Sequence, residues 1–276
     1  MLVFFIIVAV YSFFVVGCGK IKIHKKHESI AAELKKIPDR QYKSIHTFRN
    51  KRNTVELVEI NGTTFVIKQY KVPNIFNRIA YTYFRKSKAQ RAYEYALKIL
   101  RCGISTPFPV AYIETTRGGL FHTSYFISEY IPHPTLDTWR EQEHSEAENT
   151  KLAEDFINFT IDLHEKEILP LDYNPGNIFY YKDEKSGEYR FALTDINRAK
   201  FGRLSRYKDT MHSFEQLGLS AQELYTILTE YCKRRNLDIE ASLFVALYYR
   251  IKKRIKKMIK QKAKKQHSRK QHKIHC

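Results

Sequence analysis

The spacing of apolar residues differs between two parts of this chain, one typical of strands and the other typical of helices. Between residues 44 and 130 the apolar residues alternate or cluster in short runs of strand length, and turn signals separate the runs at Asn61-Gly62 and Gly118-Gly119. The strands predicted in this way are residues 44–48, 54–60, 63–70, 109–115 and 120–130. From residue 146 onward the apolar residues mostly recur at helical spacing. The pattern predicts a small antiparallel β-sheet lobe followed by a mainly helical lobe.

One helix interrupts the predicted strands, and it carries a candidate acidic residue. Residues 87–101 read as a helix capped by Ser87 and closed by Gly103, with Glu94 in its middle. Lys68 lies on the strand before it, on the face opposite Phe65 and Ile67. Taken alone, Lys68 reads more readily as an ordinary exposed strand lysine, and Glu94 could equally be a solvated surface residue.

The stretch that carries most chemistry follows a long amphipathic helix at residues 146–166. His164 is at the end of this helix, where we expect it to be buried and structural. Residues 171–179 read Leu-Asp-Tyr-Asn-Pro-Gly-Asn-Ile-Phe, and a short hairpin then leads to Thr194-Asp195. This places the carboxylate of Asp172, the amide of Asn177 and the carboxylate of Asp195 in a fixed order. One Asp can accept a proton from an attacking hydroxyl, while Asn and a second Asp can hold Mg²⁺ through oxygen ligands.

At these residues the chain resembles the protein kinase-like fold. More narrowly, it is similar to the bacterial lipopolysaccharide kinases, which phosphorylate Kdo or heptose sugars of the lipopolysaccharide inner core. The resemblance runs from about residue 44 to about residue 201. The other segments that carry it are Phe65-Val66-Ile67-Lys68, Arg91-Ala92-Tyr93-Glu94, Gly103-Ile104-Ser105-Thr106-Pro107, Phe126-Ile127-Ser128-Glu129-Tyr130-Ile131 and Leu163-His164-Glu165-Lys166.

The resemblance implies a bilobal α+β fold and a transfer of the γ-phosphoryl group of ATP to a hydroxyl. It assigns Lys68 to the ATP phosphates, and it assigns Glu94 to an ion pair that positions Lys68. Glu129 and Ile131 fall at the hinge, where backbone groups would bind adenine. Asp172 would be the catalytic base or orienter. Asn177 and Asp195 would hold Mg²⁺ or Mn²⁺.

Three positions depart from the protein kinase pattern. Residues 49–53 read Arg-Asn-Lys-Arg-Asn where a glycine-rich phosphate cover is expected, so this basic loop would contact phosphates through side chains. Pro170 stands where a structural histidine usually lies. Asp195 is followed by Ile196-Asn197 rather than Phe-Gly, which argues against a protein kinase-type switch.

Charge separates the C-terminal end from the rest of the chain. Residues 250–276 hold thirteen Lys or Arg and no acidic residue, and without them the net charge of +19 falls to +6. Leu247, Ile251, Ile255, Met258 and Ile259 fall on one face of a predicted basic helix. Such a helix suits an anionic membrane surface. A solvated tail remains an alternative, and nucleic acid ranks below the membrane because no aromatic residue follows Lys260.

The N-terminal end is apolar and uncharged over residues 1–19, which is long enough to span a bilayer. It reads as a membrane anchor followed by basic residues on the cytoplasmic side, as a signal peptide, or as a mis-assigned start. The four cysteines are scattered without paired spacing, which fits a reducing compartment. We therefore expect a cytoplasmic protein at the cytoplasmic face of the inner membrane.

The predicted organisation is an apolar segment at 1–19, a basic juxtamembrane lead-in at 20–43, a kinase-like N-lobe at 44–131, a C-lobe at 132–249 and a basic tail at 250–276. The resemblance favours a lipid-linked sugar acceptor, Kdo of Kdo-lipid A. The alternatives are a protein Ser/Thr or Tyr kinase, a small-molecule kinase, and a catalytically inactive kinase-like membrane scaffold.

Overall fold

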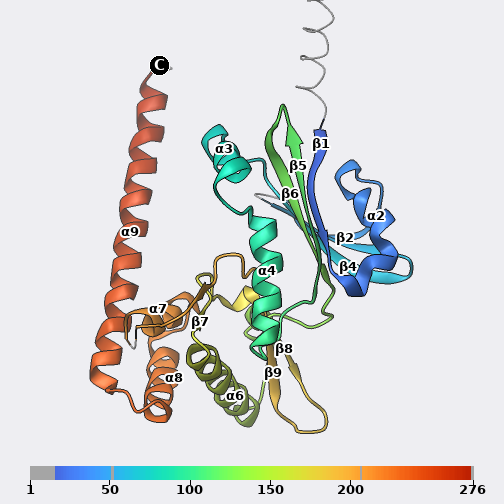
Figure 1. The fold of residues 1–276 in the computed structure, drawn as a ribbon. Helices are drawn as coiled ribbons and strands as arrows, with labels where there is room; N and C mark the ends of the chain where they lie inside the picture. The colour runs from blue at the N-terminus through green and yellow to red at the C-terminus, as the bar shows by residue number, and fades with distance from the viewer. Residues whose placement is uncertain (1–15, 51–52, 206, 275–276) are drawn as a thin grey trace, which may run out of the picture. The chain divides into compact units, whose positions relative to one another are not determined.

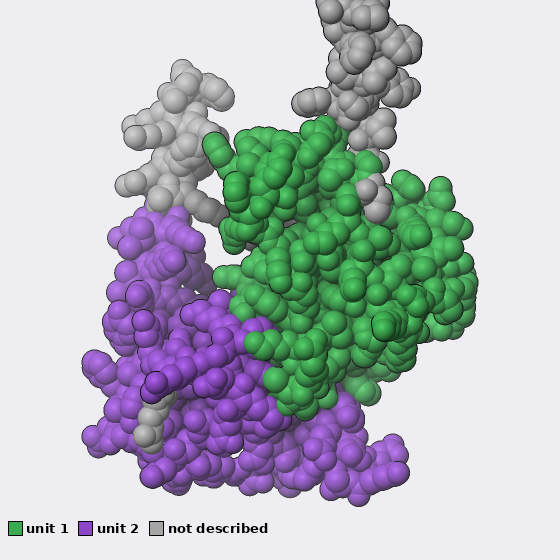
Figure 2. Space-filling view, in the orientation of Figure 1, with its two compact units in different colours: residues 1–134, 192–199 green, residues 135–191, 200–276 purple. Residues whose placement is uncertain are grey.

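The computed structural model describes residues 16–50, 53–205 and 207–274. The chain forms two compact units (Figure 2), of which unit 1 comprises residues 1–134 with 192–199 and unit 2 comprises residues 135–191 with 200–276. Unit 1 contains a large antiparallel sheet and unit 2 is mainly helical (Figure 1). The predicted fold class of a β-sheet lobe and a helical lobe is confirmed.

The sheet of unit 1 has six strands in the order β1-β5-β6-β4-β3-β2, and every neighbouring pair is antiparallel. Asn61 and Gly62 both have positive φ, as the predicted type I′ turn between β3 and β4 requires. Five of the strands match the predicted ones, and β1 was not predicted. The strands are β1 (Val16–Ile23), β2 (Lys43–Asn50), β3 (Asn53–Ile60), β4 (Thr63–Tyr70), β5 (Pro109–Arg117) and β6 (Leu120–Glu129).

Helices cover both faces of this sheet because its strands alternate buried residues between the faces. Phe65 and Ile67 of β4 join a core with the segment η1 (Lys25–Ile30), α2 (Ala31–Lys35) and η2 (Ile37–Asp39). Tyr70 faces the other way and packs with Ala89 and Tyr93 of helix α4 (Lys88–Arg101). Ser87 caps α4, and Gly103 follows it with positive φ, as predicted. A further helix, α3 (Ile75–Tyr83), lies between β4 and α4 and was not predicted.

Residues 20–43, expected as a basic lead-in, belong to the sheet lobe instead. Lys20 and Lys22 alternate with Ile21 and Ile23 in β1, and the two isoleucines pack against the core. Leu34 and the neighbouring Ile37 are fully buried. The lobe therefore includes residues well before 44. Residues 1–15 of the predicted apolar segment lie outside the described residues, and residues 16–19 are part of β1.

Unit 2 is built around the predicted long helix. This helix, α6 (Glu146–Glu165), begins with a capping box formed by Ser145 and Glu148. Helix α8 (Ala221–Arg234) begins with the same kind of capping box, formed by Ser220 and Glu223. The other elements are α5 (Leu136–Trp139), β7 (Ile168–Leu169), η3 (Pro175–Asn177), β8 (Ile178–Lys182), β9 (Tyr189–Leu193), β10 (Lys200–Phe201), α7 (Lys208–Gln216), α8 (Ala221–Arg234) and α9 (Ile239–Ile274).

The predicted basic tail is part of a longer helix. Helix α9 runs without a break through residue 250, where the tail was expected to begin. Ser242 and Ala246 are buried, whereas the described side chains from 251 to 262 are exposed. Lys253 Nζ still contacts Glu215 at 2.9 Å, so packing on unit 2 continues slightly past the predicted boundary. None of the helices in the described ranges combines the length and the apolar composition that crossing a bilayer would require.

Candidate active site

Unit 1 holds two of the predicted site residues in direct contact. Lys68 Nζ, on β4, lies 2.7 Å from Asp195 Oδ1, and both side chains are largely shielded from solvent. Asn197 Nδ2 donates a second hydrogen bond of 2.5 Å to the same carboxylate oxygen. Asp195 has φ of 54°, a left-handed conformation that is uncommon for residues other than glycine. The fold thus holds this carboxylate in one orientation beside the lysine.

Tyr70 lies beneath this ion pair and was not singled out from the sequence. Its ring centroid is 5.6 Å from Lys68 Nζ, and its side chain is buried. Burial raises the pKa of the Tyr70 phenol well above its ordinary value, and the nearby Asp195 carboxylate raises that pKa further. The Tyr70 phenol is therefore uncharged and forms one side of the site next to Lys68. The signal for it was the strand alternation, which puts residue 70 on the face of residue 68.

Glu94 does not pair with Lys68, which corrects the expected ion pair. Its Oε2 accepts a hydrogen bond of 2.6 Å from Lys86 Nζ, and its Oε1 accepts one of 3.0 Å from Gln90 Nε2. Both carboxylate oxygens are thus engaged by residues close to it in the chain. The charge partner of Lys68 in this structure is Asp195, not Glu94.

The predicted hinge residues lie at the end of β6, where Glu129 is the last residue of the strand and Ile131 comes two residues later. The Glu129 N–H donates to the Phe108 carbonyl at 2.9 Å, so this N–H has a protein partner. The Glu129 carboxylate contacts Lys26 Nζ at 2.9 Å and His27 Nε2 at 3.0 Å. The side chain therefore ties the N-terminal segment to the end of β6. The expectation that backbone groups of Glu129 and Ile131 bind adenine stays a prediction.

In unit 2 the predicted catalytic loop closes on the backbone of Asp172. The Asp172 carbonyl accepts hydrogen bonds from Asn177 Nδ2 at 2.9 Å and from Asn174 Nδ2 at 3.1 Å. The Asn174 N–H also donates to this carbonyl, at 2.9 Å. Because the Asn177 side chain donates its Nδ2 hydrogen bond within the loop, Asn177 Oδ1 is the side-chain atom that could bind a cation. Asp172 and Asn177 are thus brought together, as the motif predicts.

Tyr173 anchors this loop to helix α6. Its side chain is 1% exposed, its hydroxyl lies 2.8 Å from Thr160 Oγ1, and its ring stacks on Phe156. Burial raises the pKa of Tyr173, so the phenol is neutral at physiological pH. Nothing in the sequence distinguished this tyrosine from an exposed loop residue, although it adjoins the candidate base.

His164 is buried at the end of α6, as predicted. Its Nδ1 lies 2.8 Å from the Tyr231 hydroxyl and its Nε2 lies 3.3 Å from Ser213 Oγ. Burial, reinforced by the positive charge of Arg235, lowers the pKa of His164 to about 3. This neutral, enclosed ring is a structural element that joins α6 to α7 and α8.

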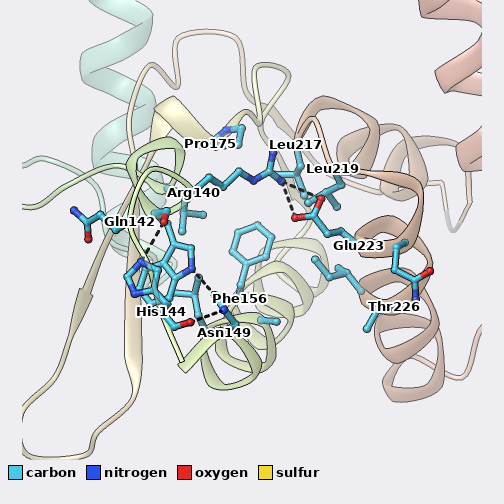
Figure 3. Close-up of a pocket in the computed structure, with 16 residues that line it drawn as sticks. Arg140, Gln142, His144, Asn149, Phe156, Pro175, Leu217, Leu219, Glu223 and Thr226 are labelled. Carbon is cyan, nitrogen blue, oxygen red and sulfur yellow. Dashed lines mark hydrogen bonds and ion pairs between the residues drawn. The ribbon is translucent and has the colours of Figure 1, made fainter. Parts of the chain in front are cut away.

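A cavity of about 510 Å³ lies in unit 2 beside the catalytic loop (Figure 3). Its lining is mostly apolar and includes Phe156 of α6 and Pro175 of the loop. Trp139 forms part of the wall, with its indole stacked on His144 and its Nε1 donating to Asn149 Oδ1 at 2.9 Å. Arg140 contacts Glu223 at 3.4 Å and supplies polar groups to the cavity. Apolar walls with a few polar groups are typical of small-molecule sites.

Among the described residues no three His, Cys, Asp or Glu side chains cluster as a metal site. At a nucleotide, Mg²⁺ takes only one or two protein oxygen ligands and completes its shell with phosphates and water. Asp195 and Asn177 supply ligands of this kind. Their side-chain oxygens are of the type that fits a nucleotide-bound magnesium ion.

Comparison with known proteins adds a family and a fold. The model of the Lipopolysaccharide kinase (Kdo/WaaP) family matches residues 35–240 of this chain. Among solved structures, the chain is similar to "WaaP in complex with acyl carrier protein" at a TM-score of 0.57 and 15% identity, covering 86% of this chain and 99% of that chain. No curated protein matches the sequence. The family match covers well over half of the chain, and the structural likeness supports the fold alone.

Proposed function

We propose that this chain, which belongs to the Lipopolysaccharide kinase (Kdo/WaaP) family and is an ATP-dependent kinase of the lipopolysaccharide core, transfers phosphate to a hydroxyl of Kdo in Kdo-lipid A. The family accounts for the reaction class and for the broad acceptor class. The choice of Kdo, the roles of individual residues and the place of action are our proposals.

The roles follow from what phosphoryl transfer requires. Lys68 neutralises the ATP phosphates, and Asp172 accepts or orients the proton of the attacking hydroxyl. The observation that carries this assignment is the Lys68–Asp195 contact at 2.7 Å, in which a strand lysine and the acidic residue after β9 share one small site. A lysine that leaves Asp195 for the nucleotide would free the carboxylate for a cation.

Asn177 and Asp195 are the residues that would hold Mg²⁺. The bound ion would neutralise charge on the transferred phosphoryl group. The chain's own contribution is to restrain both ligands. The hydrogen bond from Asn197 orients Asp195, and the bond to the Asp172 carbonyl orients Asn177.

A lipid-linked acceptor is consistent with the exposed part of helix α9. The exposed apolar side chains Ile251, Ile255, Met258 and Ile259 recur along it among many lysines and arginines. An amphipathic basic helix lies in the interface of an anionic membrane. Because ATP is cytosolic, we place the enzyme at the cytoplasmic face of the inner membrane.

The cavity beside Pro175 is our candidate for part of the acceptor. It adjoins the loop that carries Asp172, and it lies wholly within unit 2. Thr226 lines it and is exposed, so Thr226→Trp would narrow the cavity without disturbing a buried core. This variant should raise the KM for the acceptor and leave the KM for ATP unchanged.

Labelled ATP tests the proposed acceptor directly. The wild-type chain should transfer the γ-phosphate to purified Kdo-lipid A, and not to a generic protein substrate. Labelling of the protein alone would favour the protein kinase alternative. Negligible turnover with every acceptor, and no difference between wild type and Asp172→Ala, would favour the inactive scaffold.

A further inference from the structure

Helix α3 in unit 1 turns its apolar side outward. It has no buried residue, and its N-terminus is capped by Asn74, whose side chain accepts from the Asn77 N–H at 3.0 Å. At 100° per residue, Ile75, Phe76, Ile79 and Tyr83 fall within one face. All four are exposed, as are the flanking residues Val72 and Phe84. These six residues form what we call the α3 patch.

Contacts from the adjoining side of α3 hold the helix to the sheet. The Arg78 guanidinium donates to the Phe121 carbonyl at 2.7 Å and to the Arg117 carbonyl at 3.0 Å. Thr82 Oγ1 accepts from the Phe121 N–H at 2.9 Å, and Tyr81 packs edge-on against the Phe121 ring. The helix therefore lies against the end of the β5–β6 hairpin (Figure 1). It is fixed there by specific bonds with its apolar face directed away.

This arrangement is the reverse of an ordinary surface helix, which packs its apolar face on the core. Phe76 is 79% exposed and Phe84 is 80% exposed. Rings that are this exposed contribute little to the stability of the folded protein. A continuous apolar patch of this kind marks an interaction surface.

The charge around the α3 patch indicates the partner. Residues 71–93 contain six Lys or Arg and no Asp or Glu. Arg78 is used to fix the helix and Lys86 pairs with Glu94, whereas Lys71 and Arg85 flank the patch and are exposed. Apolar side chains surrounded by basic ones match the two components of an anionic bilayer surface, its acyl region and its negative headgroups.

We propose that the α3 patch inserts into the interface of an anionic membrane, as a contact in the sheet lobe separate from the basic helix α9. The contact depends on neither the kinase reaction nor the identity of the acceptor. It would give the enzyme two membrane contacts on different parts of the chain, one in each unit.

Vesicle binding by the full chain tests the proposal. The probe is a vesicle of phosphatidylcholine with about one third phosphatidylglycerol, and binding is measured by flotation. The double variant Phe76→Ser/Phe84→Ser should bind at least tenfold more weakly than wild type. Tyr225→Ser, which changes an exposed aromatic on α8, is the matched control and should bind as wild type does. Circular dichroism and ATP binding verify that each variant is folded.

A second variant reports insertion itself. Phe76→Trp adds a fluorophore to the patch, and the native tryptophan, Trp139, is buried in unit 2 as a constant background. The emission of the tryptophan introduced by Phe76→Trp should shift to shorter wavelength when anionic vesicles are added. Lipids brominated on the acyl chain should quench that emission.

Three results would overturn the proposal. The first is vesicle binding that the two serines leave unchanged, with no shift from Phe76→Trp. The second is no binding of the wild-type chain to the anionic vesicles. The third is a blue-shifted emission without vesicles, from a dimer that the serine variant dissociates, which would make the patch an interface between two copies. None of these readouts uses phosphoryl transfer, so their failure is distinct from a failure of the proposed function.

Discussion

The burial of His164 predicts a specific loss of stability at acidic pH. The ring is 4% exposed between Tyr231 and Ser213, and its pKa falls from 6.5 to about 3 on folding. Between these values the unfolded chain binds a proton that the folded protein does not. Stability is therefore retained above pH 6.5 and is lost progressively as the pH falls toward 3.

The magnitude follows from the shift. Each pKa unit corresponds to about 1.4 kcal/mol, so lowering the pH from 7 to 5 costs the folded state about 2 kcal/mol through this one group. His164→Gln removes the titration and keeps a polar side chain. The wild-type chain should lose about 2 kcal/mol more unfolding free energy over this interval than the variant does.

Urea unfolding at pH 7 and pH 5 measures both losses. Trp139, the single tryptophan of the chain, lies in unit 2 with His164 and reports its unfolding by fluorescence. His46→Gln, on the exposed edge strand β2, should behave as wild type does. Equal losses in the wild type and in His164→Gln would refute the reasoning and would mean that His164 takes up its proton in the folded state.

Two further predictions concern the site. Glu94→Gln should change the KM for ATP less than about threefold, because the Glu94 carboxylate is held by Lys86 and Gln90 rather than by Lys68. Lys68→Met should lower kcat/KM about a hundredfold, and steady-state kinetics measures both effects. A large loss in Glu94→Gln would mean that Glu94 pairs with Lys68 during turnover. Tyr173→Phe should cost about 1 kcal/mol in urea unfolding, through the lost hydrogen bond to Thr160, and a cost near zero would show that this bond does not hold the loop.

The sequence was most informative where local signals agree. Asn61-Gly62, the Ser87 cap and the alternation along residues 63–70 each specify one conformation, and the structure has all three. The Asp172–Asn177 spacing likewise predicts a loop that brings both residues together. These features depend on neighbours within a few residues, so tertiary packing does not override them.

The features that were missed depend on contacts distant in the chain. Strand β1 adjoins the apolar segment at residues 1–15, so the sequence shows one apolar run followed by lysines, and its pairing with β5 has no local signal. Glu94 has Gln90 one helical turn before it and Lys86 nearby, but the sequence cannot rank these partners against Lys68. The left-handed backbone of Asp195 is likewise a product of the surrounding fold.

The central claim is that Asp172, Asn177 and Asp195 serve one magnesium nucleotide. A crystal structure with Mg²⁺ and a non-hydrolysable ATP analogue tests it most directly. We predict Asn177 Oδ1 and an Asp195 carboxylate oxygen at about 2.1 Å from the ion, with the Asp172 carboxylate facing the γ-phosphate. A bound nucleotide whose metal contacts neither Asn177 nor Asp195 would contradict the account.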